Sequence, residues 1–347
     1  MKAIVLEAFG GPDVLRLADV PDPHCGPDDV LVAVHAVSVN RTLDLAVRSG
    51  SYVRRPPLPH VLGVDPAGVV VAVGGRVTGR KVGDRVFVNL FVPSDDPKAI
   101  YMREVGRVQL LGVDRWGGYA EKVAVPATNT HPIPEGIDFA QAIALARHGP
   151  TALNLLENRA GVRAGDTVLV MGATGGIGSL AVQIAKLNGA TVIAAAGAAE
   201  RVEAARALGA DFVVDYRKND LRTEVERITD GRGVDIVCDN VGDPDLWPKA
   251  FWSLALGGRL VTAGAHAGGE VGLDLKRLYM RRLQIIGDGS EAPGGVARIF
   301  DLAVAGSLRG LVQQILPLED AARAHELVAA RTGVGKIVLT PQGATES

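Results

Sequence analysis

The stretch "VLVMGATGGIGSLAVQIAKLNGA", residues 168–190, decides the fold of this chain. Its first four residues are apolar, the next seven contain four glycines, and apolar residues then recur at helical spacing. This order predicts a buried strand, a tight turn and a helix that begins at the turn. Because a helix N-terminus presents backbone amides to an anion, the stretch also predicts a phosphate-binding turn.

The glycines of this turn have separate tasks in the prediction. Gly175 lets the backbone approach a pyrophosphate, and Gly178 lets the helix pack closely against the strand. The sequence departs slightly from the usual G-x-G-x-x-G pattern, because Ala173 stands at the first glycine. The alternative is a structural glycine turn that binds no ligand. The residues predicted to bind a dinucleotide at the turn are Ala173, Thr174, Gly175, Gly176, Ile177 and Gly178.

The sequence on either side of the turn has two textures. From about 150 to 289, apolar runs alternate with helical patterns, which predicts an α/β unit with a parallel sheet covered by helices on both faces. Residues 1 to about 125 are instead short β-branched runs broken by Gly and Pro, as in a barrel-like β unit. The tail, 290–347, predicts two helices and a closing strand. With 347 residues, the chain is expected to form two domains.

The end of the second predicted strand, "IAAAGAAER" at 193–201, indicates which dinucleotide is bound. Sites for NAD place an acid here to bind the ribose hydroxyls, but residues 196–198 offer none and Arg201 follows closely. The missing carboxylate and the nearby guanidinium favour the 2′-phosphate of NADP. The alternative for Arg201 is a solvated arginine on the helix face, paired with Glu200 or Glu203.

Composition excludes several classes of partner. Apolar residues make up 47% of the chain and the net charge is −2, so no charged field directs it to nucleic acid or to anionic lipid. No apolar run is long enough to span a membrane, and the start does not read as a signal peptide. The two cysteines, Cys25 and Cys238, are expected to be free thiols, which favours a reducing, cytoplasmic location.

With the glycine turn in place, other motifs point to one family. They are "AFGGPDVLRL" at 8–17, "LPHVLGVDPAGVVVAVG" at 58–74, "GGYAEKVAVP" at 117–126 and the terminal "GKIVL". Over essentially its whole length, the chain resembles the medium-chain dehydrogenase/reductases. The resemblance implies a GroES-like β-barrel catalytic domain (1–148 and 290–347), a Rossmann domain (149–289) and an active site in the cleft between them. It also implies a homodimer formed partly through the last Rossmann strand, near "LQIIGDG".

Against this family, the metal ligands are missing. Zinc members carry a cysteine near the position of Asn40 and a histidine in a Gly-His-Glu motif, which here reads Gly63, Val64, Asp65. The lobe that holds structural zinc needs four cysteines between about 90 and 110, and this segment has none. The expectation is therefore that no metal is bound. Without zinc, the chain resembles the quinone oxidoreductase-like branch, whose active-site segment is similar to "VNRTLDLAVRSGSY" at 39–52.

The resemblance to this branch assigns further residues. It implies that Asn40 lies beside the nicotinamide and that Tyr52 lies in the substrate cleft. His148, near the family's third zinc position, either lines the cleft or is a satisfied core histidine. The remaining histidines, His24, His131, His266 and His325, are expected at the surface or in loops. The residues that the resemblance adds to the cofactor site are Thr151, Asn240, Gly264 and Ala265 near the nicotinamide, and Tyr216 and Arg331 with Arg201 at the 2′-phosphate.

Chemistry without a metal limits the substrate. A zinc ion would polarise a carbonyl oxygen, so its loss favours an acceptor that conjugation already makes electrophilic. The prediction is hydride transfer from NADPH to a quinone or an α,β-unsaturated carbonyl, with Tyr52 as proton donor and Asn40 as a positioning residue. The alternative for Tyr52 is a rim tyrosine that only shapes the cleft. Two other functions stay open: a tailoring enoyl or keto reductase of a biosynthetic pathway, and an NADPH-binding sensor or structural protein with little turnover.

Overall fold

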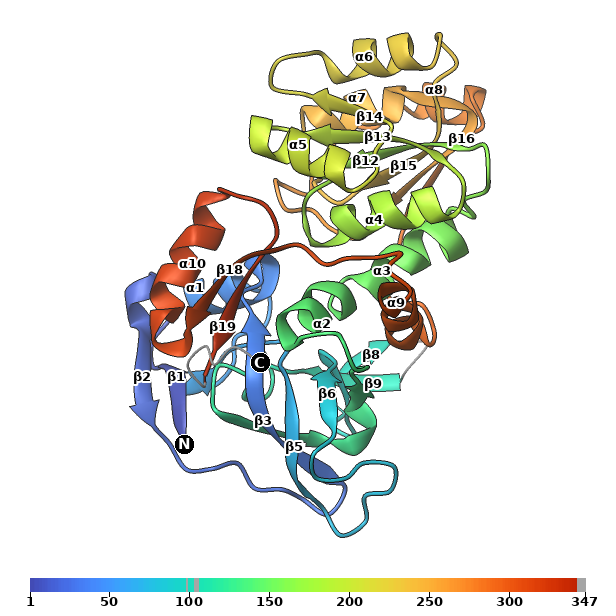
Figure 1. Ribbon diagram of the computed structural model, residues 1–347. Helices are drawn as coiled ribbons and strands as arrows, with labels where there is room; N and C mark the ends of the chain where they lie inside the picture. Colours follow the sequence, from blue (N-terminus) through green and yellow to red (C-terminus); the bar gives the residue numbers. More distant parts are fainter. Residues whose placement is uncertain (98, 103–105, 342–347) are drawn as a thin grey trace. The chain divides into compact units, whose positions relative to one another are not determined.

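The computed structural model describes residues 1–97, 99–102 and 106–341. The chain divides into two compact units (Figure 1). The first unit comprises Met1–Arg147, Val312–Thr332 and the chain from Lys336 onward, and the second comprises His148–Leu311 with Gly333–Gly335. In the part of the chain that is described, no helix combines the length and the apolarity that crossing a membrane requires.

The second unit contains a parallel sheet of six strands. Its strands are β12 (Thr167–Met171), β13 (Thr191–Ala196), β14 (Phe212–Asp215), β15 (Val234–Asp239), β16 (Leu254–Thr262) and β17 (Gln284–Gly287). They lie in the order β14-β13-β12-β15-β16-β17. Successive strands are therefore added toward one edge of the sheet from β12 to β14 and toward the other edge from β15 to β17, so the strand order reverses between β12 and β15. In open α/β sheets, ligands bind at the carboxyl ends of the strands at such a reversal.

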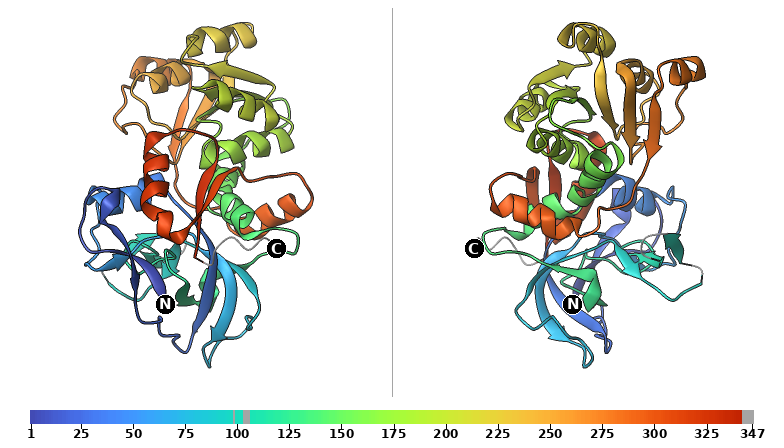
Figure 2. Two further views of the ribbon diagram at one scale, coloured as in Figure 1. Left: turned by 60° about the vertical axis from the view of Figure 1, so that its left-hand side comes forward. Right: turned by 90° about the vertical axis from the view of Figure 1, so that its right-hand side faces the viewer.

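Helices lie on both faces of this sheet (Figure 1 and Figure 2). The helical elements of this unit are α3 (Gly149–Leu153), α4 (Gly176–Leu187), α5 (Ala199–Ala207), α6 (Leu221–Ile228), α7 (Leu246–Trp252), α8 (Leu275–Met280) and α9 (Gly295–Val304), with a π-helical turn η4 (Asn154–Arg159). Of these, α4, α5, α6 and α7 pack on strands of the sheet. Every residue of β12 is buried, because helices cover both sides of a central strand. The predicted α/β class is confirmed.

The first unit is built mostly from antiparallel strands, with β18 and β19 paired in parallel. Its main sheet runs β11-β6-β5-β3-β19-β18, and β10 also pairs with β3. The strands are β1 (Lys2–Leu6), β2 (Leu15–Asp19), β3 (Asp29–Ser38), β4 (His60–Val61), β5 (Ala67–Val73), β6 (Arg85–Val88), β7 (Phe91–Pro93), β8 (Ile100–Met102), β9 (Gly106–Leu110), β10 (Lys122–Pro126), β11 (Thr130–Pro132), β18 (Val312–Pro317) and β19 (Lys336–Thr340). Valines and leucines from both ends of the chain form one core.

Pairing of distant segments completes this unit. β19, near the C-terminus, pairs antiparallel with the end of β3, which places Val338 opposite Ser38 (Figure 1). The helical elements are η1 (Pro12–Val14), the π-helical turn η2 (Arg41–Leu45), α1 (Ala46–Ser49), η3 (Ala127–Asn129), α2 (Phe139–Ala146), η5 (Leu318–Asp320) and α10 (Ala321–Ala330). Asp138 caps the N-terminus of α2, because its carboxylate accepts a hydrogen bond from the Gln141 backbone amide at 2.7 Å.

The division between the units differs from the predicted one after residue 290. The structure assigns 290–311 to the second unit, whereas the prediction returned the chain to the first domain at 290. The physical reason is helix packing: α9 lies against α3, and a Cβ on Gly149 of α3 would stand 2.7 Å from Cδ1 of Ile299. His148 also belongs to the second unit, one residue before the predicted start of the Rossmann domain.

Candidate active site

The glycine turn lies between β12 and α4. Gly172 has a φ of +63°, and a Cβ on Gly178 would lie 2.1 Å from the Gly172 carbonyl oxygen, so both positions require glycine. The Gly175 amide donates to the same carbonyl at 2.9 Å and closes the turn. The amides of the first helical turn, which have no partner within the helix, follow directly. This backbone cradle fits a pyrophosphate.

The residues of the turn differ in their exposure. Ala173, Thr174 and Ile177 are buried in the second unit, so a ligand would meet their backbone rather than their side chains. Gly175 is exposed, and Gly176 is partly exposed. The exposed backbone at the start of α4 is therefore the part of the turn that a ligand can reach.

His148 and Thr151 lie beside this turn in the second unit. His148 immediately precedes α3, and a Cβ on Gly176 would stand 2.6 Å from its Nδ1, so the imidazole rests on the glycine backbone. Thr151 is buried within α3, which packs against α4. Both predicted residues are thus close to the phosphate turn, and any side chain at Gly176 would displace the histidine.

Three further predicted residues meet at the carboxyl ends of β15 and β16. A Cβ on Gly264 would stand 3.1 Å from the Asn240 carbonyl oxygen, and a Cβ on Gly242 would stand 2.9 Å from Cα of Ala265. The Asn240 side chain is buried, and its Oδ1 meets no hydrogen-bond donor among the residues that are described. A buried acceptor without a donor is costly, so this oxygen fits a ligand amide such as the carboxamide of a nicotinamide.

The ends of β13 and β14 hold the residues predicted at the 2′-phosphate. Tyr216 lies directly over Gly197, where an added Cβ would stand 2.6 Å from its hydroxyl oxygen. Arg201, in the first turn of α5, donates from Nε to the carbonyl of Gly333 at 3.4 Å. Glu200 accepts a hydrogen bond from the Gly333 amide at 3.1 Å, so this acid binds backbone. Gly197 and Tyr216 therefore form one small surface beside the start of α5.

Arg331, the last residue predicted at this phosphate, belongs to the first unit. It ends α10 with a left-handed φ of +55°. Arg41 lies near it, because its Nη1 donates to the carbonyls of Val328 and Ala329 in the last turn of α10. Two arginines therefore lie at the C-terminal end of α10, Arg331 at its C-cap and Arg41 from η2. Such cations are favourable there, because the C-terminal end of a helix dipole is negative.

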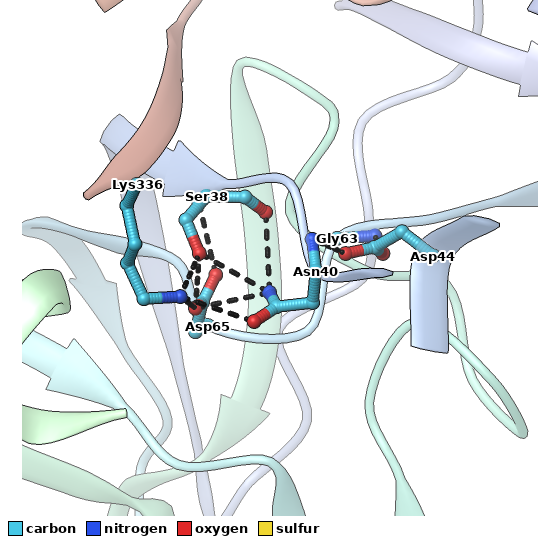
Figure 3. A network of polar contacts seen from close by, with 6 residues as sticks. All are labelled: Ser38, Asn40, Asp44, Gly63, Asp65 and Lys336. Carbon is cyan, nitrogen blue, oxygen red and sulfur yellow. Dashed lines mark hydrogen bonds and ion pairs between the residues drawn. The ribbon is translucent and has the colours of Figure 1, made fainter. Parts of the chain in front are cut away.

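Asn40 is held in a buried polar network in the first unit (Figure 3). Lys336 Nζ donates to Ser38 Oγ at 2.7 Å and to Asn40 Oδ1 at 3.0 Å, and it lies 3.4 Å from Asp65 Oδ2. Asp65 also accepts from the Ser38 amide at 2.9 Å and from the Ser38 hydroxyl at 2.5 Å. The buried Lys336 ammonium and Asp65 carboxylate thus compensate each other's charge, and the neutral side chains of Ser38 and Asn40 hydrogen-bond to both groups.

The network fixes the direction of the Asn40 amide. Its Nδ2 donates to Asp65 Oδ2 at 3.2 Å and to Ser38 Oγ at 3.1 Å, while Lys336 requires the oxygen to face the ammonium. Both amide hydrogens are therefore committed within the protein, and the oxygen keeps one lone pair. The sequence reasoning missed Ser38, Asp65 and Lys336 as partners of Asn40, because they are far apart in the chain.

Asp44 anchors the π-helical turn that follows Asn40. Its Oδ2 accepts a hydrogen bond from the backbone amide of Asn40 at 2.7 Å, and its Oδ1 accepts one from the backbone amide of Gly63 at 3.0 Å (Figure 3). Burial, with a smaller effect from Asp65, raises the pKa of this carboxyl to about 7. Asp44 thus ties the Asn40 segment to the loop after β4, and its pattern in the sequence does not distinguish it from a surface acid.

Tyr52 lies a few residues beyond α1 in the same unit, half-buried against the core. Burial raises the pKa of its phenol, Asp114 adds to the effect, and Arg54 and Arg147 oppose it. Arg54 pairs with Asp114 at 3.0 Å. The phenol is therefore protonated at neutral pH and can donate a hydrogen bond.

The expectation that His325 lies at the surface is wrong. The side chain is fully buried in α10; its Nε2 lies 3.1 Å from Tyr119 Oη, and its Nδ1 lies 3.4 Å from Arg48 Nη1. Burial, helped by the Arg48 charge, lowers the pKa of this imidazole to about 3, so it is neutral. One polar residue among other polar residues gives no sign of burial in the sequence. His325 is buried because the inner face of α10 packs against the hydrophobic core of the first unit, to which the helix belongs.

The donor chemistry in the first unit does not suit zinc. At the two ligand positions stand Asn40, whose amide is committed to the network, and Val64, a fully buried aliphatic side chain. Lys336 adds a positive charge beside them. Across residues 1–97, 99–102 and 106–341, no three His, Cys, Asp or Glu side chains gather to hold a metal ion.

Comparison with known proteins relates both units to one family. Residues 26–135 match the alcohol dehydrogenase GroES-like domain, and residues 176–301 match the zinc-binding dehydrogenase domain. The chain is 32% identical over 347 residues to a quinone oxidoreductase of Rattus norvegicus, covering 98% of this chain and 97% of the relative.

Solved structures agree. A crystal structure of an NAD-dependent alcohol dehydrogenase has a TM-score of 0.90 and 40% identity, covering 98% of this chain and 99% of that one. A mycobacterial protein complexed with NADPH has a TM-score of 0.82 and 32% identity, covering 98% of this chain and 100% of that one. With both domains matched and relatives aligned along its whole length, this chain belongs to the medium-chain dehydrogenase/reductase superfamily of oxidoreductases, in its quinone oxidoreductase-like branch.

Proposed function

We propose that this protein is an NADPH-dependent reductase that delivers hydride, without zinc, to a quinone or to the β-carbon of an α,β-unsaturated carbonyl. The observation that carries the proposal is the donor set around Asn40. An amide with both hydrogens committed, a valine and an ammonium replace the groups that would hold a metal. An acceptor whose conjugation already spreads negative charge suits such a site better than a simple ketone.

The second unit supplies the cofactor residues in this proposal. The backbone of 172–178 and the start of α4 bind the pyrophosphate, and the unpaired Oδ1 of Asn240 accepts the carboxamide hydrogen bond. Tyr216 and Arg201 contact the 2′-phosphate in this proposal. Residues 196–198 at the tip of β13 are small and leave room for the phosphate, and none of them is an acid that would bind the ribose hydroxyls instead. When bound, NADPH supplies the hydride from its nicotinamide ring.

The first unit supplies substrate positioning and the proton. The oxygen of Asn40 is the part of its amide left to bind a ligand, so Asn40 acts as an acceptor that orients a donor group. Tyr52 donates a hydrogen bond to the substrate oxygen and is the first candidate for proton donor. Because burial raises the pKa of Tyr52, the phenol keeps its proton until the substrate becomes more basic.

Oxidation of NADPH by a panel of quinones and enones tests the proposal, followed by the absorbance of the reduced nicotinamide. The expected result is turnover with part of the panel, with NADPH preferred over NADH. Tight binding of NADPH without turnover of any member would instead support a sensor or structural role. Stoichiometric zinc in the purified protein would contradict the zinc-free mechanism, and turnover of only large enones would favour the tailoring reductase.

We also propose that the protein forms a homodimer through β17. This strand is an edge of its sheet, and Ile285 on it is 37% exposed. The preceding helix, α8, also exposes the large side chains of Tyr279 and Met280. Light scattering should give twice the chain mass of 36.2 kDa, and Ile285→Lys should give the monomer.

The two free cysteines fit a reducing cytoplasm, where we place the enzyme.

A further inference from the structure

The amide group of Asn240 is satisfied unequally at its two ends. The residue directly follows β15 and is 5% exposed, and its Nδ2 donates to Sγ of Cys238 at 3.7 Å. Its Oδ1 is buried and meets no donor in the part of the chain that the structure describes. A buried acceptor without a donor costs free energy, so this oxygen calls for a donor from outside the chain.

The thiol that binds this amide belongs to the centre of the sheet. Cys238 lies near the carboxyl end of β15, paired with Val170 of β12 on one side and Val261 of β16 on the other, and it is fully buried. Side chains two residues apart along a strand lie on the same face, so the pleat of β15 places the thiol beside Asn240. Burial raises the pKa of the thiol to about 12. The sulfur is therefore neutral, and it acts on Asn240 through a hydrogen bond rather than through thiolate chemistry.

The backbone that carries Asn240 is also fixed in place. The buried carboxylate of Asp239 accepts hydrogen bonds from the backbone amides of Val241 at 3.2 Å and Gly242 at 3.1 Å, which closes a tight turn after β15. A Cβ on Gly172 of the glycine turn would lie 3.0 Å from Cγ2 of Val241, so the two turns adjoin. Asn240 therefore stands at a defined place beside the phosphate cradle.

With this backbone fixed, the freedom that matters is rotation of the Asn240 amide about its last torsion angle. A half-turn about this angle exchanges the oxygen and the nitrogen, and so replaces an acceptor by a donor. The bond from Nδ2 to Sγ of Cys238 favours the orientation in which the nitrogen faces the thiol and the oxygen is turned elsewhere. The thiol thus selects which atom of the amide is left for a ligand.

We propose that Cys238 is a positioning residue: by holding Nδ2 of Asn240, it directs Oδ1 to accept a hydrogen bond from the carboxamide of a nicotinamide. The inference rests on the proposed function, because a nicotinamide lies there only if the protein binds NADPH. It also defines the class of ligand. The site prefers a cofactor whose ring substituent donates a hydrogen bond over one whose substituent only accepts. A fixed carboxamide keeps the ring in one orientation, which hydride transfer requires.

Isothermal titration of the full-length protein with cofactor analogues tests this preference. In the 3-acetylpyridine analogue of NADP⁺, a methyl group replaces the carboxamide nitrogen, so the ring substituent accepts a hydrogen bond but donates none. Wild type should bind NADP⁺ about tenfold more tightly than this analogue, because the buried Asn240 oxygen then lacks a donor. The thionicotinamide analogue keeps the nitrogen and is the matched control; its affinity should lie within about threefold of that of NADP⁺.

Variants of Cys238 separate positioning from packing. Cys238→Ala and the larger Cys238→Val both remove the acceptor of Nδ2, so the amide can turn and donate to the carbonyl of either nucleotide. Their preference for NADP⁺ over the acetyl analogue should fall from about tenfold to less than about threefold. Cys238→Ser keeps an acceptor and should retain the preference. Cys25→Ala, which removes the free thiol of the first unit, should also retain it. The preference is a ratio within each protein, so a general loss of stability does not alter it.

The outcomes separate failure of the inference from failure of the proposed function. Equal affinities of wild type for NADP⁺ and the acetyl analogue would mean that the Asn240 oxygen binds an internal water only, which overturns the inference and leaves the reductase standing. An unchanged preference in Cys238→Ala or Cys238→Val would overturn the role of the thiol alone. A wild type that binds NADP⁺ but turns over no acceptor would overturn the reductase, and the affinity ratios would still decide the role of Cys238. A wild type that binds no NADP⁺ would overturn both.

Discussion

The two units build their candidate sites from different material. In the second unit, the phosphate cradle is backbone from one short stretch, residues 172–178. In the first unit, the network around Asn40 is made of side chains from three distant segments, and the bond from Lys336 to Ser38 joins residues 298 apart in sequence. A backbone site is encoded in a local motif, whereas a side-chain site exists only after the chain has folded.

This difference predicts how each site fails. The backbone cradle should tolerate most changes of side chain but not an added Cβ, because carbonyl oxygens fill the space. The side-chain network should tolerate little change of charge, because its members are buried and each depends on the others. Four experiments test the contrast, in order of expected effect.

The largest effect is expected from Lys336→Met in the first unit. It leaves Asp65 as a buried carboxylate without a compensating charge, which should lower the free energy of unfolding by about 3–5 kcal/mol. Urea denaturation measures the change. The double variant Lys336→Met with Asp65→Asn removes both charges and should recover part of the loss. A single variant as stable as wild type would show that the network is not electrostatically coupled.

The next effect concerns pH, because two buried groups of the first unit oppose each other. Asp44, with its pKa raised from 3.8 to about 7, stays protonated in the folded state while the unfolded chain ionises, so its contribution to stability falls as pH rises through this range. His325, lowered from 6.5 to about 3, stays neutral while the unfolded chain is protonated, so its contribution rises with pH. Each slope is about 1.4 kcal/mol per pH unit.

Single variants should expose the two slopes. Between about pH 4.5 and 6, Asp44→Asn should leave a stability that rises with pH relative to wild type, and His325→Gln should leave one that falls. Urea midpoints at several pH values give both. The comparison of slopes does not depend on how much each variant destabilises the protein at one pH. Parallel slopes in the two variants would contradict the buried, neutral states of both groups.

The third effect tests the cradle of the second unit. Gly178→Ala would place a Cβ 2.1 Å from the Gly172 carbonyl oxygen, so the turn must open. We expect a cost of about 1–3 kcal/mol in NADPH binding, measured by fluorescence titration. Gly272→Ala is the matched control in the same unit, because no atom lies within 4 Å of its added Cβ. Equal affinities of the two variants would show that the cradle does not bind the cofactor.

The smallest effect should come from a side chain in the second unit. Arg201→Ala removes a proposed phosphate contact and should weaken NADPH binding by about tenfold, or about 1.4 kcal/mol, with NADH binding unchanged. Isothermal titration with both cofactors measures the ratio. Equal losses for NADPH and NADH would place Arg201 away from the 2′-phosphate and support its alternative as a solvated arginine of α5.

The fold was largely readable from the sequence because its signals are local. The apolar run of β12, the glycines of 172–178 and the helical spacing of α4 stand next to one another, and each element follows from its own residues. The exceptions depend on packing. Residues 290–311 join the second unit because α9 packs against α3, and His325 is buried because α10 packs against the hydrophobic core of the first unit, to which it belongs.

The sequence by itself determined the glycine cradle, the parallel sheet around it and the absence of zinc ligands at Asn40 and Val64, since each depends on residue type at a position or on a short spacing. Only the tertiary structure decided what replaces those ligands. Pairing of β19 with β3 brings Lys336 to Ser38 and Asn40, and the loop after β4 adds Asp65. A hydrogen bond depends on distance in space, and no local pattern carries that information across hundreds of residues.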